Sequence, residues 1–455
     1  MTVFDPDSVR LLQAQLQDKN YIDRNDYSRF GVKRGLRNAD GTGVMAGLTK
    51  ICSVEGYVID DGEKIPKKGN LFYRGVNVND LVDACRMENR FGYEETAFLL
   101  LFGQLPTTHQ LEVFRAELAE RRELPDNFTE DMIMKAPSPD IMNKLARGVL
   151  SLYSYDDAPD DLSVDNVLEQ TLRLIARLPS IMAYAYQVKR RNYYHKSMYI
   201  HPPKARHATA EVILNSIRSD KEFTDAEAKL LDTCLMLHAE HGGGNNSTFA
   251  VRVLSSSGTD TYAAISAGIG ALKGSKHGGA NHKVAQMLEY IKSDVTDMTD
   301  EGQVADSLSK ILRREGNDGS GLVYGMGHAV YTISDPRAVI LKREAQRFAA
   351  GTEFEEEFQL INLVETLTPT LFREITGKEK TMCANVDLYS GLIYKMLRIP
   401  PDLFTPLFAV ARIAGWSAHR MEELYTGGRI IRPAYKSIVK HRDYIPLIER
   451  KEESV

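Results

Sequence analysis

The sequence predicts a mainly α fold with a single small β region. Apolar residues recur at helical spacing along most of the 455 residues, and no internal repeat or low-complexity tract breaks this pattern. Convincing strand material is confined to residues 43–75. Hydrophobic residues make up 43% of the chain and charged residues 26%, which is the composition of a globular protein with ample material for a core.

The strand material predicts a small β hairpin. Two stretches rich in β-branched and aromatic residues, 48–54 and 57–59, lie on either side of Gly56. Asp61 and Gly62 follow them as a typical turn pair. We therefore expect a hairpin near residues 43–75.

The clearest predicted helix spans residues 225–241. Thr224 and Glu227 have the spacing of a capping box, in which each side chain accepts a hydrogen bond from the other residue's amide. Three glycines from Gly242 onward end the apolar pattern. Further helices are predicted over residues 93–102, 110–122, 165–190, 262–272, 337–349 and 404–424.

Two segments are predicted to be loops from their composition. Residues 156–161 and 316–321 are rich in Asp, Gly, Pro, Asn and Ser, which favour turns over helices and strands. The second segment directly precedes the most unusual part of the chain.

Charge and hydropathy argue against several classes of protein. Lys and Arg number 57 against 62 Asp and Glu, so the formal charge of −5 does not favour a general nucleic-acid or anionic-membrane binder. The longest apolar runs, such as residues 97–102, are far shorter than the roughly 18–20 residues that span a bilayer. The N-terminus resembles neither a secretory signal nor a transit peptide, so we expect a cytoplasmic protein.

The four cysteines do not suggest a disulfide framework or a zinc ribbon. Cys52, Cys85, Cys234 and Cys383 are widely spaced and lie among apolar or helix-forming neighbours. We expect them to be buried thiols.

Five of the eleven histidines lie between His238 and His328, interleaved with glycine. Glycine beside histidine allows a backbone or a ligand to approach the ring closely. His238 and His241 are three residues apart on a predicted helix and could chelate zinc, but neither the HExxH spacing nor any cysteine supports this, so no metal site is predicted. For His241 taken alone, the preferred interpretation is that it caps a helix C-terminus, where a cation is stabilised.

Two arginines occupy positions that call for an anion. Arg412 lies on one helical stripe with Phe404, Phe408 and Trp416, the only tryptophan. Its guanidinium would pair either with an internal carboxylate or with a carboxylate ligand held bidentately. Arg337 lies in the first turn of a predicted helix, where its charge opposes the helix dipole, so it too would gain from an anionic ligand.

Asp387 is predicted to lie at the start of a helix. There it could serve only as a partner of the helix dipole. The same dipole would keep the carboxylate ionised and available as a base.

Six motifs, in order along the chain, closely resemble those of the citrate synthase family. They are HAEHG at 238–242, KHGGAN at 276–281, GMGHAVYTISDPR at 325–337, NVDLYSG at 385–391, ARIAGW at 411–416 and IRP at 431–433. Upstream, LFYRG at 71–75 followed by Asp80 and Leu81 extends the likeness, which covers roughly residue 43 to the C-terminus.

The resemblance implies a large helical domain and a smaller helical domain with the active site in the cleft between them. Residues 31–277 and 388–455 would form the large domain and residues 278–387 the small one, with residues 1–30 as a helical N-terminal arm. Closure of the two domains over the substrates would assemble the site only when oxaloacetate is bound.

The resemblance also implies the chemistry of an acyltransferase of the tricarboxylic acid cycle, which joins the methyl carbon of acetyl-CoA to the ketone of oxaloacetate and then hydrolyses the thioester. Asp387 matches the family's base, and His277 matches the group that donates a hydrogen bond to the thioester oxygen. His328 matches the residue that polarises the ketone. No metal or cofactor is implied, since hydrogen bonds aimed at the developing oxyanions do the electrostatic work and acetyl-CoA is a substrate.

Four further residues match the family's oxaloacetate ligands: His241, Arg337, Arg412 and Arg432. Arg432 matches an arginine that reaches the active site of the partner subunit, so the resemblance implies a homodimer with Arg432 contributed across the interface. No nucleic-acid or membrane partner is expected.

Three alternatives stay open at this stage. A 2-methylcitrate synthase would use propionyl-CoA, whose one extra methylene changes discrimination by only about 1 to 3 kcal/mol. A metal hydrolase would use the histidines as ligands. A non-catalytic acyl-CoA-binding relative would be expected to lack one of His277, His328 or Asp387, and all three are present.

Overall fold

The computed structural model describes residues 10, 13, 16, 20–38, 40–61 and 63–450, and helices form most of this part of the chain. The expectation of a mainly α fold with one small β region is confirmed, because the only sheet among the described residues has three strands in the order β1-β2-β3. None of the described helices is long and apolar enough to cross a membrane.

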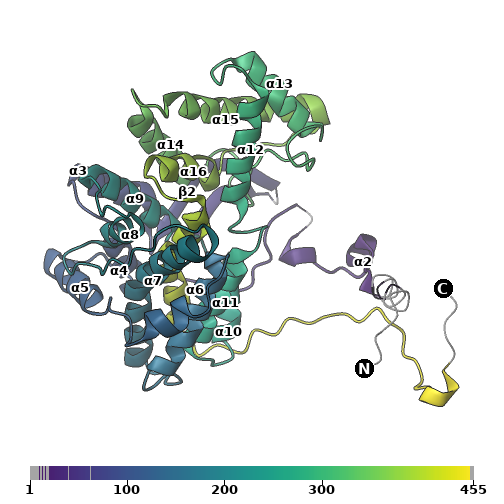
Figure 1. Cartoon of the computed structure of the whole chain (residues 1–455). Coiled ribbons are helices and arrows are strands. Elements are labelled where there is room, and N and C mark those ends of the chain that lie inside the picture. The colour runs from purple at the N-terminus through teal and green to yellow at the C-terminus, as the bar shows by residue number, and fades with distance from the viewer. Residues whose placement is uncertain are drawn as a thin grey trace.

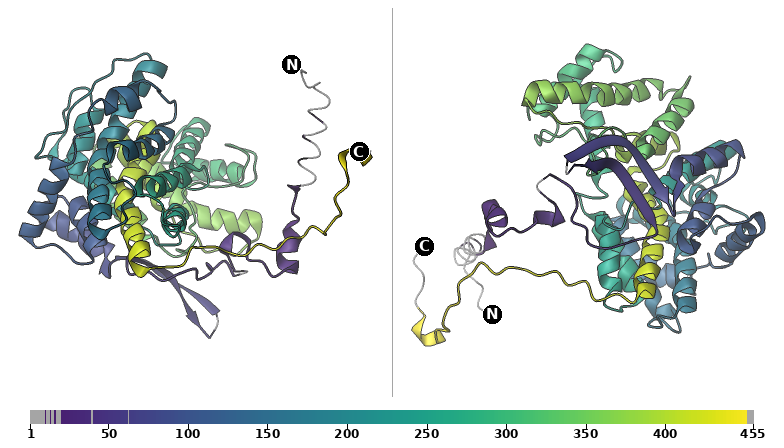
Figure 2. Two further views of the ribbon diagram at one scale, coloured as in Figure 1. Left: turned by 90° about the horizontal axis from the view of Figure 1, so that it is seen from below. Right: turned by 180° about the vertical axis from the view of Figure 1, so that it is seen from behind.

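The predicted hairpin is present and lies within the expected bounds, residues 43–75. Strand β1 (Cys52–Asp60) pairs antiparallel with β2 (Glu63–Tyr73), and β2 pairs with the short β3 (Val76–Asn77). Residues 52–54 and 57–59 of the two predicted stretches belong to one strand, with a change of register between Glu55 and Tyr57, whereas residues 48–51 precede it. Figure 2 shows this hairpin as two long ribbons projecting from the helical body.

All the predicted helices are found, with ends that shift by a few residues. Helix α4 (Tyr93–Phe102) begins and ends as predicted, and α9 (Asp225–His238) starts with the predicted capping box. The others are α5 (Thr108–Glu120), α7 (Val164–Tyr193), α11 (Thr261–Lys273), α14 (Pro336–Ala349) and α17 (Phe404–Thr426).

Additional helices were not predicted individually. They are α2 (Arg24–Arg29), α3 (Val78–Met87), α6 (Ile141–Ser151), α8 (Thr209–Ile217), α10 (Asn246–Ser255), α12 (Ala280–Asp294), α13 (Glu301–Leu312), α15 (Glu355–Thr376) and α16 (Val386–Met396). Single turns and short irregular helices occur at Arg34–Leu36, Thr129–Met134, Leu152–Tyr155, Pro401–Leu403 and Leu447–Glu449.

Helix α9 ends at His238, three residues earlier than predicted. Side chains from other elements bind the carbonyl groups at this end: the Tyr73 hydroxyl donates to the carbonyls of Met236 and Glu240, both at 3.1 Å. Arg412 donates to the carbonyl of His238 at 2.6 Å. Since these side chains supply the hydrogen bonds that the last carbonyls of a helix need, the helix can end here. His241 therefore lies in the loop beyond it.

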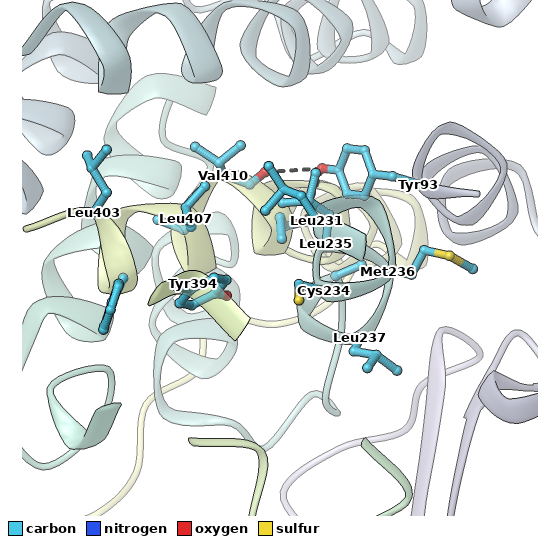
Figure 3. Close-up of a cluster of buried hydrophobic side chains, with 14 of the residues drawn as sticks. Tyr93, Leu231, Cys234, Leu235, Met236, Leu237, Tyr394, Leu403, Leu407 and Val410 are labelled. Atoms are coloured by element: carbon cyan, nitrogen blue, oxygen red, sulfur yellow. Dashed lines mark hydrogen bonds between the residues drawn. The ribbon is translucent and has the colours of Figure 1, made fainter. Parts of the chain in front are cut away.

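Helix α9 lies in the core between α4, α16 and α17. Figure 3 shows Leu231, Cys234 and Leu235 of α9 in one apolar cluster with residues of the neighbouring helices. The Tyr93 hydroxyl of α4 donates to the carbonyl of Val410 in α17 at 3.1 Å, the dashed line of Figure 3. This packing fixes the C-terminal end of α9 beside the middle of α17, where several of the predicted site residues lie.

Figure 1 shows α12 to α16 gathered at one end of the molecule, above the larger group of helices that contains α4, α7 and α17. Helix α16 packs mainly against α14 and α12. The predicted boundary after residue 387 falls inside α16. The division into two domains stays a prediction.

Both ends of the described chain lie away from the helical body (Figures 1 and 2). Much of the predicted N-terminal arm lies outside the described residues, and α2 is its one described helix. After α17 the chain continues as an extended, exposed tail to residue 450.

The cysteines and loops agree with the sequence predictions. All four cysteines are free thiols, with Cys85, Cys234 and Cys383 buried and Cys52 half-buried. Residues 156–161 and 316–321 form loops and turns.

Candidate active site

The predicted histidines meet where the loop after α9 faces the loop that precedes α14. The ring centroids of His241 and His328 are 5.1 Å apart. The Tyr331 ring stacks on His328 with a centroid separation of 4.7 Å and contacts the edge of His241 at 5.6 Å. Residues nearly 90 positions apart in the sequence therefore form one wall of a common site.

The backbone around His328 fixes which of its ring nitrogens carries the proton. The amides of Val330 and Tyr331 donate to Nδ1 of His328 at 3.0 and 3.1 Å. Nδ1 must therefore be the acceptor, and in the neutral ring the proton lies on Nε2. Burial, with a smaller contribution from the charge of Arg337, lowers the pKa of His328 to about 4. The ring is thus neutral near pH 7 and presents an N–H donor.

The β1–β2 hairpin supports the loop that carries these amides. Gly69 donates its backbone amide to Ser334 Oγ at 3.2 Å. A Cβ atom at Gly69 would lie 2.0 Å from the carbonyl oxygen of Ser334, and one at Gly56 would lie 2.6 Å from that of Val330. Only glycine allows this close approach of two backbones. The bulge at Gly56 therefore lies where the strand packs directly against the loop.

His277 lies in the turn between α11 and α12, with one ring nitrogen held by the protein. Its Nε2 lies 3.1 Å from Ser247 Oγ, which also accepts a hydrogen bond from the indole of Trp416 at 3.1 Å. Burial, together with the charge of Arg412, lowers the pKa of His277 to about 4. Like His328, it is a neutral imidazole near pH 7.

Asp387 lies in the first turn of α16, as predicted, and Asn385 caps this helix by accepting from the Asp387 amide at 3.0 Å. The surrounding protein raises the pKa of the Asp387 carboxyl to about 6, although the nearby charge of Arg337 acts in the opposite direction. The expectation that the helix dipole alone would determine its ionisation was therefore incomplete. Desolvation makes the carboxylate a stronger base than an exposed aspartate while leaving it mostly ionised at pH 7.

Arg337 is buried at the start of α14 and already has an internal partner. Its Nε and Nη2 donate to the two carboxylate oxygens of Asp335 at 3.0 and 2.7 Å. Asp335 also caps α14 by accepting from the Arg337 amide. A carboxylate two residues away therefore offsets part of its charge, and Nη1 makes no hydrogen bond to the described residues. The prediction that Arg337 binds a ligand carboxylate stays a prediction.

Arg412 lies fully buried in α17 without such a partner. Its Nε donates to the carbonyl of His238, and the guanidinium lies over the Phe408 ring at 4.7 Å. Nη1 and Nη2 have no hydrogen-bond partner among the residues that the structure describes. An internal carboxylate, one of the two partners predicted for Arg412, therefore does not bind Nη1 or Nη2 among the described residues.

His241 also presents an unsatisfied group. It is buried, and its Nε2 has no hydrogen-bond partner within the described part of the chain. Burial, together with the charge of Arg337, lowers the pKa of His241 well below its usual range, so the ring is neutral. Unpartnered buried polar groups on His241 and Arg412 mark a place where a polar ligand would replace lost hydration.

The structure does not bring Arg432 to this site within one chain. It lies exposed in the tail after α17. His238 and His282 also lie elsewhere: His238 Nε2 meets the Tyr394 hydroxyl at 3.0 Å in the core, and His282 is exposed on α12. Among the described residues, no group of three or more His, Cys, Asp or Glu side chains could hold a metal ion.

Three contributors to the site were not assigned roles from the sequence: Tyr331, Ser247 and Asp335. Each contacts one predicted residue: Tyr331 contacts His328, Ser247 contacts His277 and Asp335 contacts Arg337. Asp335 alone had a recognisable sequence pattern, because an Asp-Pro pair before a helix is typical of an N-cap followed by a first-turn proline.

A separate cavity of about 580 Å³ lies between α3, α9 and α14. Its charged side chains are largely paired with one another, as in the contacts of Lys229 with Asp225 and of Arg347 with Glu344. This cavity contains none of the predicted site residues.

Residues 38–434 match the family model described as "Citrate synthase, C-terminal domain". The chain is 34% identical to citrate synthase of Haloferax volcanii over 92% of this chain and 99% of that protein. It is 31% identical to 2-methylcitrate synthase 1 of Corynebacterium glutamicum over 92% of this chain and 98% of that protein.

A crystal structure of citrate synthase from Thermotoga maritima has the same fold. The superposition has a TM-score of 0.70 at 29% sequence identity and covers 90% of this chain and 98% of that one.

Proposed function

This chain belongs to the citrate synthase family, and on that premise we propose that it is an acyltransferase that condenses acetyl-CoA with oxaloacetate and water to give citrate and CoA. The observation that carries this proposal is the state of Arg412. Its guanidinium is fully buried, and two of its nitrogens have no hydrogen-bond partner among the described residues, which is costly unless an anion binds there.

Oxaloacetate supplies two carboxylates to match these groups. Nη1 and Nη2 of Arg412 would hold one of them bidentately, with Arg337 and the unpartnered Nε2 of His241 as further donors. Asp335 would keep Arg337 ionised and in place while its Nη1 contacts the ligand.

The ketone of oxaloacetate would lie at His328. The Nε2–H group of this ring donates a hydrogen bond to the ketone oxygen, which makes the ketone carbon more electrophilic. The Val330 and Tyr331 amides hold the ring in the required tautomer, so no proton has to be rearranged before the reaction.

Asp387 would remove a proton from the methyl carbon of acetyl-CoA. As the enol or enolate forms, Nδ1 of His277 would donate to the thioester oxygen. This requires the Ser247 hydroxyl to turn from Asn245 and donate to Nε2 of His277. The methyl carbon then forms a bond to the ketone carbon, and the ketone oxygen takes the Nε2 proton of His328. The proton that Asp387 has taken up replaces it, so that both groups return to their starting states. Water hydrolyses the resulting thioester to citrate and CoA.

We further propose that the working unit is a homodimer in which Arg432 enters the partner's site. The exposed tail that carries Arg432 extends away from the helical body, which is compatible with such a contact (Figure 1). The proposed reaction uses no metal or cofactor, and its place is the cytoplasm, as part of the tricarboxylic acid cycle.

The test is oxaloacetate-dependent release of free CoA, measured in parallel with acetyl-CoA and propionyl-CoA. A higher kcat/KM with acetyl-CoA supports citrate synthase. A higher value with propionyl-CoA would assign the chain to the 2-methylcitrate synthases, which are also among its relatives. No release with either thioester would refute the proposed reaction.

A further inference from the structure

A line of buried polar side chains runs behind the loop that carries His241. Arg252 of α10 donates to Nδ1 of His419 in α17, from Nε at 3.1 Å and from Nη2 at 2.7 Å. Nε2 of His419 lies 3.0 Å from Oε1 of Glu240, the residue before His241. Both His419 and Glu240 are completely buried, so water does not compete for these contacts.

The presence of arginine determines which groups donate and which accept the hydrogen bonds along this line. A guanidinium can only donate hydrogen bonds, so Nδ1 of His419 must accept and Nε2 carries the proton of the neutral ring. His419 therefore donates to Glu240. Arg252 is itself held by Glu422 and Glu423, which fixes the outer end of the line.

Glu240 connects His419 to the backbone next to His241. Its Oε1 accepts from His419 and also from the backbone amide of Gly242 at 2.5 Å. Gly242 has a φ of +89°, a conformation that favours glycine, so the turn after His241 is both special and held in place. One carboxylate oxygen thus links His419 to the backbone directly after His241.

The second oxygen of Glu240 faces the arginine side of the site. It accepts no hydrogen bond from the described residues and lies so close to α17 that a Cβ atom at Gly415 would be 2.1 Å away. Gly415 is three residues after Arg412. The negative charge of Glu240 partly offsets the burial of the Arg412 guanidinium without occupying Nη1 or Nη2, which therefore stay available for a ligand.

We propose that Arg252, His419 and Glu240 form a positioning relay that orients His241 and Arg412 for the carboxylates of oxaloacetate. The relay rests on the proposed function, since oxaloacetate is the ligand that the two residues would hold. None of the three relay residues touches the substrate, and each acts through another residue.

Two variants at position 419 separate positioning from simple packing. In His419→Gln the amide N–H can still reach Glu240, whereas in His419→Asn the shorter side chain can accept from Arg252 but does not reach Glu240. Loss of a hydrogen bond to a buried charged group should weaken oxaloacetate binding about tenfold in His419→Asn, with less effect in His419→Gln. The dissociation constant is measured by calorimetry, kcat by CoA release and thermal stability by calorimetric melting.

The expected pattern is a larger change in oxaloacetate affinity than in kcat, because His241 and Arg412 bind the carboxylates in both the ground state and the transition state. Equal oxaloacetate affinity in His419→Asn and the parent protein would overturn the relay. A parent protein that binds oxaloacetate confirms the ligand independently of the relay, whereas one that binds none would overturn both.

A second pair of variants covers the case in which the changes at His419 prevent folding. Arg252→Met removes the donor that sets the His419 tautomer and should also weaken oxaloacetate binding about tenfold. Arg420→Met is the matched control, because Arg420 is a buried arginine of α17 that binds Thr261, Ser255 and Thr259 and not the relay. The relay is wrong if both substitutions lower stability alike and neither changes the affinity for oxaloacetate.

Discussion

The backbone amide of Tyr331 donates a hydrogen bond to Nδ1 of His328 at 3.1 Å, while the Tyr331 ring stacks on the imidazole at 4.7 Å. Tyr331 therefore acts on both the plane of the ring that would polarise the ketone and, together with the Val330 amide, its tautomer. Tyr331 is in turn held by the β1–β2 hairpin, since its hydroxyl donates to the carbonyl of Asn70 at 3.4 Å. The small sheet thus contributes to the site without supplying a reacting group.

Gly69→Ala should lower kcat by about 100-fold, because the added methyl group would displace Ser334 and with it the loop that orients His328. The control is Gly47→Ala, where a Cβ atom meets nothing within 4 Å and kcat should stay at the parental value. Steady-state CoA release measures both. An unchanged kcat in a folded Gly69→Ala protein would show that the hairpin does not position His328.

Arg412→Leu should raise the dissociation constant of oxaloacetate at least about tenfold, with a smaller effect on kcat. It should not cause the loss of about 3 to 5 kcal/mol that follows when one partner of a buried ion pair is removed, since Nη1 and Nη2 have no partner among the described residues.

Arg337→Leu is the comparison for stability, because it leaves the buried Asp335 without its partner and should cause that loss. Chemical denaturation measures the free energy of unfolding of both variants. If Arg412→Leu is the less stable of the two and still binds oxaloacetate normally, Arg412 is a structural residue.

The pH dependence should reflect Asp387. Its pKa is raised to about 6, so the base is active when ionised and the rate should fall as the pH drops through about 6. His277 and His328, with pKa values lowered to about 4, should contribute no step between pH 5 and 8. The pH profile of kcat/KM tests this, and a rate that stays constant from pH 8 to pH 5 would contradict it.

The same raised pKa predicts an effect on stability. An ionised Asp387 is disfavoured in the folded protein, so its cost is fully present above the folded pKa and absent below the ordinary value of 3.8. Asp387→Asn should therefore raise the free energy of unfolding by on the order of 3 kcal/mol at pH 8 and by little below pH 4. Urea denaturation at the two pH values measures the difference, and equal effects at both would refute the assignment.

A shared site predicts complementation between subunits. Asp387→Ala and Arg432→Ala homodimers should each be weakly active, whereas their heterodimer contains one site that lacks both residues and one that is whole. Activity of the purified heterodimer should therefore approach half that of the parent. A heterodimer no more active than the two mutant homodimers would show that Arg432 serves its own chain.

The sequence predicted most of what is local in this fold. Thr224 and Glu227 form the expected capping box, and α4 begins and ends as its apolar pattern predicts. The end of α9 could not be predicted, because Tyr73 and Arg412 satisfy its carbonyls from positions more than 160 residues away.

In the site, too, local motifs could be predicted and contacts between distant residues could not. The motifs predicted His241, His277, His328, Asp387, Arg337 and Arg412 as site residues, but they did not indicate the groups that contact and orient these side chains. Ser247 contacts His277 across 30 residues and His419 contacts Glu240 across 179, and neither spacing has a pattern that a sequence displays. Asp335 is the exception, since it lies two residues from Arg337.

In the proposed reaction, Asp387 removes a methyl proton from acetyl-CoA in a site assembled around oxaloacetate. Exchange of those protons in deuterated water, followed by mass spectrometry with an unreactive oxaloacetate analogue present, tests it most directly. The parent protein should exchange the methyl protons, and Asp387→Ala should do so at least about 100-fold more slowly while binding the analogue with nearly parental affinity. Exchange in Asp387→Ala at the parental rate would contradict the account.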